Sequence, residues 1–260
     1  MIRELTFLGL SISTYSLMAY IAAVTCAAMS WKPLRRCGLP RAGIIILLLL
    51  MCVAFLVGAR LWNVVVNPDS YGENLHWYTF RMKGFSMYGG IFGSFIVIPV
   101  VALITRTDLV KILDALTIPA AVAFCIARVG CFLNGCCAGK ITDLPWGVHF
   151  PSSNDSALET LVTVHPTQLY ELAMALIGVP LCLWLVKLFR SGAGGRFFIY
   201  GVWFSTMRLV VLPFRSLSYS LLVRELIYPL IYYVLIVIGI FLFVWSCRKE
   251  RAENSGKAAG

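Results

Sequence analysis

The sequence predicts an all-α polytopic membrane protein with seven transmembrane helices. Of its 260 residues, 60% are hydrophobic and 13% are charged, and the mean hydropathy is +0.84. A soluble domain carries about a quarter charged residues. Apolar runs of about 20 residues are long enough to span a bilayer. Such runs occur at residues 6–29, 43–66, 85–105, 110–133, 167–188, 197–214 and 226–246.

The basic residues between these runs predict the orientation. One set of links, with the C-terminal tail, carries thirteen: Lys32, Arg35, Arg36, Arg41, Arg106, Lys111, Lys187, Arg190, Arg196, Arg248, Lys249, Arg251 and Lys257. The opposite set, with the N-terminus, carries six: Arg3, Arg81, Lys83, Lys140, Arg215 and Arg224. Because cytoplasmic links carry the excess of Lys and Arg, the N-terminus is expected outside and the C-terminus inside. The same pattern accounts for the net charge of +10 without a nucleic-acid partner.

The chain shows no internal repeat, so we expect one domain. Residues 1–247 are predicted to form a single seven-span membrane domain, and residues 248–260 a disordered cytoplasmic tail. The first apolar run follows Arg3 and is itself followed by Lys32, Arg35 and Arg36. Its length and these flanking charges favour an uncleaved first span over a cleaved signal peptide.

Three arginines lie inside the predicted spans, namely Arg60, Arg128 and Arg208. A charged side chain at mid-bilayer costs about 2.5–3.5 kcal/mol on insertion scales. At a rise of about 1.5 Å per residue, Arg60 and Arg128 lie roughly 26 and 27 Å from the inner ends of their spans. Arg208 lies about 17 Å along its span, which is past the midplane. All three are therefore predicted toward the outer leaflet.

The third and fifth predicted spans start at the outer face of the membrane, and both begin with polar residues. These are "GFSMYGG" (84–90) and "HPTQLYE" (165–171). Guanidinium groups bind phosphate bidentately, so arginines in this layer predict a clamp for a phospholipid headgroup. The alternative is that each arginine reaches the headgroup region by snorkelling, or pairs with Glu171. The glycines of "GFSMYGG", like Gly135 and Gly139, suit either close backbone approach to a headgroup or a turn at a helix end.

Three of the nine cysteines lie close together, at Cys131, Cys136 and Cys137. With His149 or His165 they form a possible zinc ligand set. The C-x4-C-C spacing is not a standard metal motif, however, and on one helix these thiols would spread around the surface. The sequence therefore predicts no metal site.

Four motifs in this order resemble the prolipoprotein diacylglyceryl transferase family: "GFSMYGGIFG", "RVGCFLNGCCAG", "HPTQLYE" and "MRLVVLPFR". The resemblance extends from about Gly58 to Arg215. It implies a seven-span protein of the bacterial plasma (inner) membrane, with its active site toward the outer leaflet. The implied reaction moves the diacylglyceryl group of phosphatidylglycerol onto the lipobox cysteine thiol of a prolipoprotein signal peptide. It yields a thioether and glycerol 1-phosphate, and it needs no metal or soluble cofactor.

The resemblance also implies the site residues. Arg128 matches the arginine of the family signature that contacts phosphatidylglycerol, and Arg208 matches an essential arginine of the sixth span. The expected catalytic residues are Arg128, Arg208, Tyr88 and His165. The expected residues that bind phosphatidylglycerol are Arg128, Arg208, Arg60, Gly89, Gly90, Asn134, Gly139, Gln168, Tyr170 and Glu171.

Four positions depart from the family pattern. Tyr88 stands where a histidine is usual, Cys131 replaces an asparagine, Cys136 replaces a glutamate, and Leu212 stands where a glutamate often occurs. With a reference pKa of about 10, a tyrosine is a poor general base. His165 is the other candidate base, or a structural residue of the His-Pro helix entry. The departures indicate either a divergent "GCC" branch of the family or an alternative function, a non-catalytic paralogue that binds phospholipid as a membrane scaffold.

Overall fold

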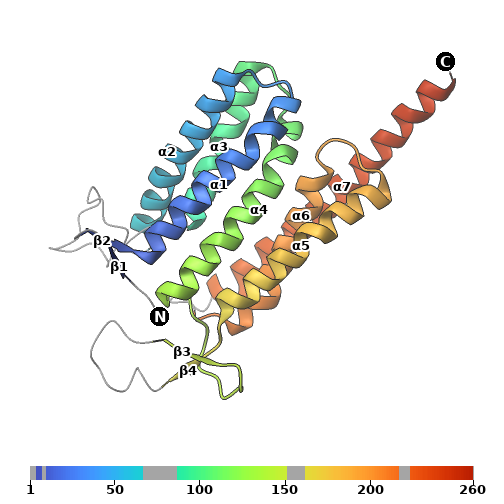
Figure 1. Cartoon of the computed structure of the whole chain (residues 1–260). Coiled ribbons are helices and arrows are strands. Elements are labelled where there is room, and N and C mark those ends of the chain that lie inside the picture. Colours follow the sequence, from blue (N-terminus) through green and yellow to red (C-terminus); the bar gives the residue numbers. More distant parts are fainter. Residues whose placement is uncertain (1–3, 8–9, 67–86, 151–161, 217–222, 260) are drawn as a thin grey trace. The chain divides into compact units, whose positions relative to one another are not determined.

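The computed structural model describes residues 4–7, 10–66, 87–150, 162–216 and 223–259, and within these ranges the chain is mostly helical (Figure 1). The helices are α1 (Thr14–Arg36), α2 (Arg41–Val66), α3 (Met87–Thr105), α4 (Leu109–Asn134), α5 (Thr167–Phe189), α6 (Gly195–Val211) and α7 (Tyr228–Ala259). A 3-10 turn, η3 (Leu212–Phe214), follows α6, and a π-helical turn, η4 (Val223–Ile227), precedes α7. Two short hairpins pair β1 (Glu4–Phe7) with β2 (Leu10–Ser13), and β3 (Val148–His149) with β4 (Thr163–Val164).

Six of the described helices are long and apolar enough to cross a membrane, which confirms the prediction of a polytopic, helical membrane protein. The exception is α3, whose described apolar part, Gly89–Thr105, is shorter. The count of seven spans therefore stays a prediction.

The predicted first span, 6–29, is wrong in its boundaries. Residues before Thr14 form an antiparallel hairpin in which Glu4 pairs with Ser13, and the helix continues to Arg36. The reason is visible in the sequence, where polar Glu4, Thr6, Ser11 and Ser13 alternate with apolar residues. This two-residue period is typical of a strand.

The predicted disordered tail also differs from the structure, because α7 continues to Ala259. The tail is rich in residues that favour helices. Lys249 and Glu253 lie one turn apart with 4.0 Å between Nζ and Oε1, and Asn254 Nδ2 donates to Glu250 Oε1 at 3.4 Å. Such pairs at four-residue spacing support an exposed helix.

The chain divides into two compact units, and both boundaries fall inside helices rather than in linkers. One unit comprises residues 27–116, and the other comprises residues 1–26 and 117–260. The boundaries lie within α1 and α4. The prediction of one membrane domain over residues 1–247 stays a prediction.

In the unit of residues 27–116, α2 and α3 pack closely over a core that includes Leu34, Ile44, Leu47, Ile98 and Ile112. Glycines on both helices allow this approach. A Cβ at Gly89 would collide with the carbonyl of Gly58, and a Cβ at Gly90 would lie 2.6 Å from the ring of Phe55. Gly89 and Gly90 therefore have a packing role that the sequence did not predict.

In the second unit, the C-terminal part of α4 packs with α5 and α6. Cys125, Ala175, Met207 and Val211 form one buried cluster, and Ala121, Cys182 and Tyr200 form another. Trp203 Nε1 of α6 donates a hydrogen bond of 2.8 Å to the carbonyl of Met174 in α5. These contacts fix the three helices side by side and so determine where their polar residues meet.

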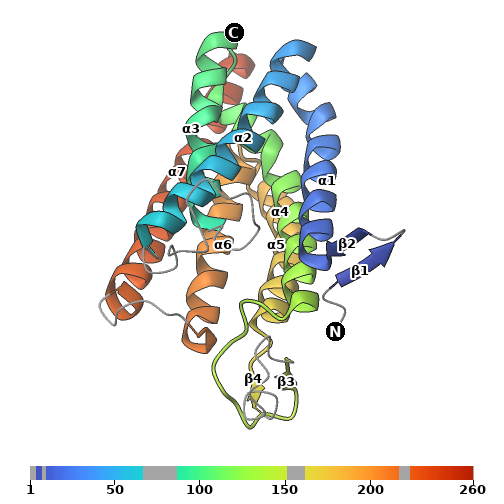
Figure 2. The same ribbon diagram turned by 90° about the vertical axis from the view of Figure 1, so that its left-hand side faces the viewer.

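The link between α4 and α5 folds back under the ends of these helices (Figures 1 and 2). Gly139 N–H donates to the carbonyl of His165, and Lys140 N–H donates to the carbonyl of Phe214, both at 2.8 Å. Gly139 also forms an antiparallel bridge with Arg215. The chain segment around Gly139 thus lies between the start of α5 and the end of η3.

Candidate functional site

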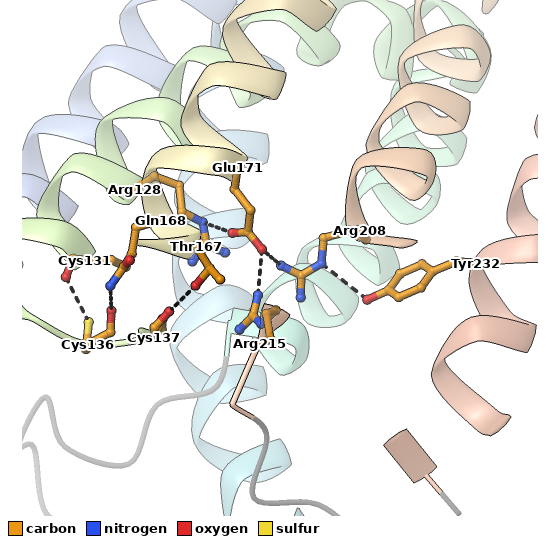
Figure 3. A network of polar contacts seen from close by, with 10 residues as sticks. All are labelled: Arg128, Cys131, Cys136, Cys137, Thr167, Gln168, Glu171, Arg208, Arg215 and Tyr232. Carbon is orange, nitrogen blue, oxygen red and sulfur yellow. Dashed lines mark hydrogen bonds and ion pairs between the residues drawn. The ribbon is translucent and has the colours of Figure 1, made fainter. Parts of the chain in front are cut away.

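One buried carboxylate, that of Glu171, contacts three arginines (Figure 3). Arg208 Nη1 and Arg215 Nη1 donate to Oε1 at 2.6 and 2.7 Å. Arg128 Nε lies 2.7 Å from Oε2, an ion-pair distance, although its N–H does not point at that oxygen as a hydrogen bond requires. The exposed fractions are 1% for Glu171 and 3–4% for Arg128 and Arg208.

This four-residue network is rich in positively charged donors. Three guanidinium groups meet one carboxylate in it. The network is therefore suited to bind an anion, and its fork-shaped donors match a phosphate.

Each member of the network comes from a different element. Arg128 is near the end of α4, Glu171 is in the second turn of α5, and Arg208 is in the last turn of α6. Arg215 directly follows η3. The helix packing described above thus brings together residues that are far apart in the sequence.

Aromatic residues hold two of the guanidinium groups. Arg128 Cζ lies 4.7 Å from the centre of the Phe124 ring, one helical turn earlier on α4. This is a favourable cation–π distance. Arg208 Nε donates to the hydroxyl of Tyr232 on α7 at 3.4 Å.

The first turn of α5 binds the chain that follows α4. Gln168 Nε2 donates to the carbonyl of Cys136 at 2.7 Å, and Thr167 Oγ1 donates to the carbonyl of Cys137 at 2.8 Å. Gln168 is 1% exposed, and its Oε1 has no donor partner among the described residues. Gln168 therefore anchors the loop with one end of its amide and presents a buried acceptor with the other.

His165 and Tyr170 belong to an aromatic cluster. Trp146 Nε1 donates to the Tyr170 hydroxyl at 2.8 Å, and His165 Nδ1 lies 3.2 Å from the same hydroxyl. The Phe214 ring centre is 5.0 Å from that of His165. The Tyr170 hydroxyl therefore links Trp146 and His165.

The three cysteines come together, contrary to the expectation that they would spread around a helix. Their Sγ atoms all lie within 4.8 Å of one another. The expectation was wrong because α4 ends at Asn134. Gly135 and Cys137 then adopt left-handed conformations, with φ of 76° and 62°, which turn the chain back on the helix end.

The Cys136 thiol donates to the carbonyl of Cys131 at 3.7 Å. The neighbouring Cys131 and Cys136 thiols lower the pKa of Cys137, and the nearby Arg128 and Arg215 charges lower it further. Cys131 lowers the pKa of Cys136, but Cys137 and burial outweigh this and raise it. The surroundings therefore favour the thiolate form of Cys137, the exposed member of the cluster.

The other predicted site residues occupy different surroundings. Gly139 is packed tightly, since a Cβ there would lie 2.6 Å from His165 Cβ and 2.8 Å from Thr167 Cγ2. Arg60 is buried in α2 and, with Gly89 and Gly90, belongs to the other unit. Tyr88 is in the first turn of α3, and its side chain lies outside the described residues.

Arg215 is the member of the network that sequence reasoning missed. It was assigned to a link between spans because it follows the sixth apolar run. The signal was Pro213, which starts a tight turn in η3 and returns Arg215 toward Arg208. Trp146 and Phe214, which pack around His165 and Tyr170, were also missed. Trp146 lies in a link, and Phe214 is the last residue of the predicted sixth span.

The chain is similar in sequence to one family of known proteins. The model of the family described as prolipoprotein diacylglyceryl transferase matches residues 3–246. A relative from Clostridium tetani is 27% identical over 236 residues, which cover 90% of this chain and 93% of the relative. A relative from Clostridioides difficile is 26% identical over 223 residues, covering 81% and 85%. One from Leifsonia xyli subsp. xyli is 29% identical over 220 residues, covering 79% and 65%. All three carry the name phosphatidylglycerol–prolipoprotein diacylglyceryl transferase.

Proposed function

The chain belongs to the prolipoprotein diacylglyceryl transferase family, and from this premise we propose its reaction and the roles of its residues. It transfers the diacylglyceryl group of phosphatidylglycerol to the lipobox cysteine thiol of bacterial prolipoproteins. The observation that carries the proposal is the buried network of Glu171 with Arg128, Arg208 and Arg215.

The chemistry requires stabilisation of a departing phosphate. The client sulfur attacks the glyceryl carbon that bears the phosphate, a C–S bond forms, and the C–O bond to the phosphate breaks. The thiol proton is lost, and glycerol 1-phosphate leaves with more negative charge than the diester carried. Cations placed in advance around this phosphate lower the barrier most, because they need no reorganisation during the reaction.

Glu171 orients these cations. Its Oε1 accepts from Arg208 and Arg215, so both guanidinium groups are held at one point before lipid binds. The guanidinium groups of the network outnumber its carboxylate three to one, which favours binding of a phosphate. In this arrangement Arg128, Arg208 and Arg215 contact the phosphate, and Glu171 is a positioning residue.

Two further polar groups suit the rest of the headgroup. The buried Oε1 of Gln168 is an acceptor for a glycerol hydroxyl. The Tyr170 hydroxyl, already bound to Trp146 and His165, is fixed in orientation. Asn134, next to the cysteine loop, and Gly139, which lets this loop pack against α5, complete the part of the site within this unit.

The client thiol must lose a proton. A free thiol has a pKa of about 8.5, so a few per cent is ionised near neutrality. Guanidinium groups nearby raise that fraction. Tyr88 and His165 are the candidate proton acceptors, and in His165 the Nδ1 atom faces the Tyr170 hydroxyl.

We place the protein in the bacterial inner membrane with its N-terminus outside, its C-terminus in the cytoplasm, and its site toward the outer leaflet. The thirteen basic residues of one set of links against six of the other support this orientation. For Arg60, Gly89 and Gly90, which belong to the other unit, binding of phosphatidylglycerol stays a prediction.

Complementation tests the function in a cell. In a bacterium depleted of its own transferase, this chain should restore growth and the mass of a mature lipoprotein, and Arg128→Ala and Arg208→Ala should abolish rescue. Exposed Arg196, on the same helix as Arg208, provides the control variant Arg196→Ala. A well-expressed chain that fails to rescue would favour the phospholipid-binding scaffold, which the departures at Tyr88, Cys131, Cys136 and Leu212 suggest.

A further inference from the structure

Cys131, Cys136 and Cys137 form a compact group of three thiols outside the arginine network. Their Sγ atoms lie within 4.8 Å of one another. Three sulfurs that share one metal at about 2.3 Å are about 3.8–4.0 Å apart. Small side-chain rotations are therefore sufficient to bring the three sulfurs to metal-binding distances.

The backbone that carries the thiols is held in place. Cys136 N–H donates to the carbonyl of Cys131 at 3.1 Å, and α5 binds the carbonyls of Cys136 and Cys137 through Gln168 and Thr167. Cys137 adopts a φ of 62°, a conformation that few residues other than glycine adopt. Such conformations are found where the surrounding structure imposes them, often at functional sites.

Access to the group is graded. Cys131 is buried, Cys136 is half-buried and Cys137 is exposed. An incoming ion meets Cys137 first and is then enclosed by the other two. The remaining cysteines described in the structure do not form a second group of this kind.

The charge of the surroundings also fits a metal–thiolate complex. Three thiolates with a monovalent cation carry a charge of −2, and with a divalent cation −1. Arg128 and Arg215 act electrostatically on Cys137 and favour its negative charge. Figure 3 shows the cysteine loop beside these arginines. The protein thus compensates the negative charge that three bound thiolates would bring.

We propose that Cys131, Cys136 and Cys137 bind one soft metal ion, Cu(I), in a three-thiolate site. Thiolate ligands select soft ions such as Cu(I), and also Zn(II). Zn(II) in a structural site takes four protein ligands. Among the described residues, no His, Asp or Glu joins the three cysteines to supply the fourth. This site is independent of the transfer reaction and needs no lipid substrate.

The test is Cu(I) binding by the purified full-length chain, reduced and kept without oxygen in detergent. Bicinchoninate serves as the competing chelator, and metal content is measured after desalting. We expect one Cu(I) per wild-type chain, with an affinity at least tenfold lower in Cys137→Ser and in Cys131→Ser. Cys52→Ser, which removes an exposed thiol elsewhere, should bind as the wild type does.

A second readout locates the metal. Bound Cu(I) should protect Cys131, Cys136 and Cys137 from alkylation by a maleimide, as measured by peptide mass spectrometry, while Cys52 remains unprotected. Because Cys137 is exposed, Cys137→Ser tests the site even if substitution of buried Cys131 impairs folding. Equal Cu(I) affinity in wild type and Cys137→Ser, or tight Zn(II) binding without Cu(I) binding, would overturn the proposal. Neither result depends on whether the chain transfers lipid.

Discussion

A single residue, Glu171, determines where the arginines meet. Without its carboxylate, three guanidinium groups would repel one another in a buried space. With it, Arg128, Arg208 and Arg215 point at one place. Losing one partner of a buried ion pair typically costs about 3–5 kcal/mol. Glu171 therefore stabilises the fold and also positions the groups that bind phosphate.

At the same scale, the reactivity of Cys137 is expected to depend little on pH. The neighbouring Cys131 and Cys136 thiols, and the charges of Arg128 and Arg215, lower the pKa of Cys137. A lowered pKa keeps the thiolate present as the pH falls, and the thiolate is the form that reacts. Between pH 8 and pH 6, alkylation of metal-free Cys137 by iodoacetamide should change less than about twofold.

The same peptide in the denatured chain provides the control. With an ordinary thiol pKa of about 8.5, its alkylation rate should fall about 75-fold over this range. Quantitative mass spectrometry of the peptide that contains Cys137 gives both rates. An equal fall in the folded and the denatured chain would show that the pKa of Cys137 is not lowered.

At the scale of elements, the link between α4 and α5 folds back on the helix ends. It thereby joins the arginine network to the aromatic cluster. Gly139 pairs with Arg215 and leaves no room for a Cβ beside His165 and the Phe214 carbonyl. Gly139→Ala should therefore displace the segment that carries Arg215, and lower both the transfer rate and the thermal midpoint of unfolding in detergent.

Gly201→Ala is the matched control on α6, because nothing lies within 4 Å of a Cβ at that position. Alanine favours a helix over glycine by up to about 1 kcal/mol, so this variant should be as stable as the wild type or slightly more so. If the two variants behaved alike, the close packing around Gly139 would not be important for the site.

Sequence reasoning identified much of the site, and the reason is physical. Arg128, Arg208 and Glu171 are conspicuous because charges in apolar helices are costly, and helix rise alone placed the two arginines toward one side. Arg215 and the cysteine cluster were not predicted, because their positions depend on backbone turns at Pro213, Gly135 and Cys137. Helix spacing gives no information beyond the end of a helix.

The same limit applies to whole elements. Hydropathy predicted seven spans, and six of the described helices are long and apolar enough to cross a membrane. The hairpin before Thr14, however, was interpreted as part of the first span. Average hydropathy does not separate a strand of alternating residues from the start of an apolar helix. The close contact of α2 and α3 at Gly58 and Gly89 also depends on partners far apart in the sequence.

At the scale of the whole molecule, the proposed orientation is testable with reporter fusions. A fluorescent protein fused after Gly260 should fold and fluoresce, because the C-terminus is expected in the cytoplasm. Alkaline phosphatase fused at the same place should be inactive, since it needs the oxidising outer compartment. An active phosphatase at the C-terminus would reverse the orientation and move the proposed site to the inner leaflet.

Transfer by the purified protein tests the central claim most directly. The chain is mixed with phosphatidylglycerol vesicles and a synthetic lipobox peptide, and the peptide mass and released glycerol 1-phosphate are measured. We predict that the peptide gains one diacylglyceryl group for each glycerol 1-phosphate released. Arg208→Ala should slow transfer about 100- to 1000-fold, while Arg196→Ala retains the wild-type rate. Transfer by Arg208→Ala at the wild-type rate, or no peptide modification by the wild-type chain, would contradict the account.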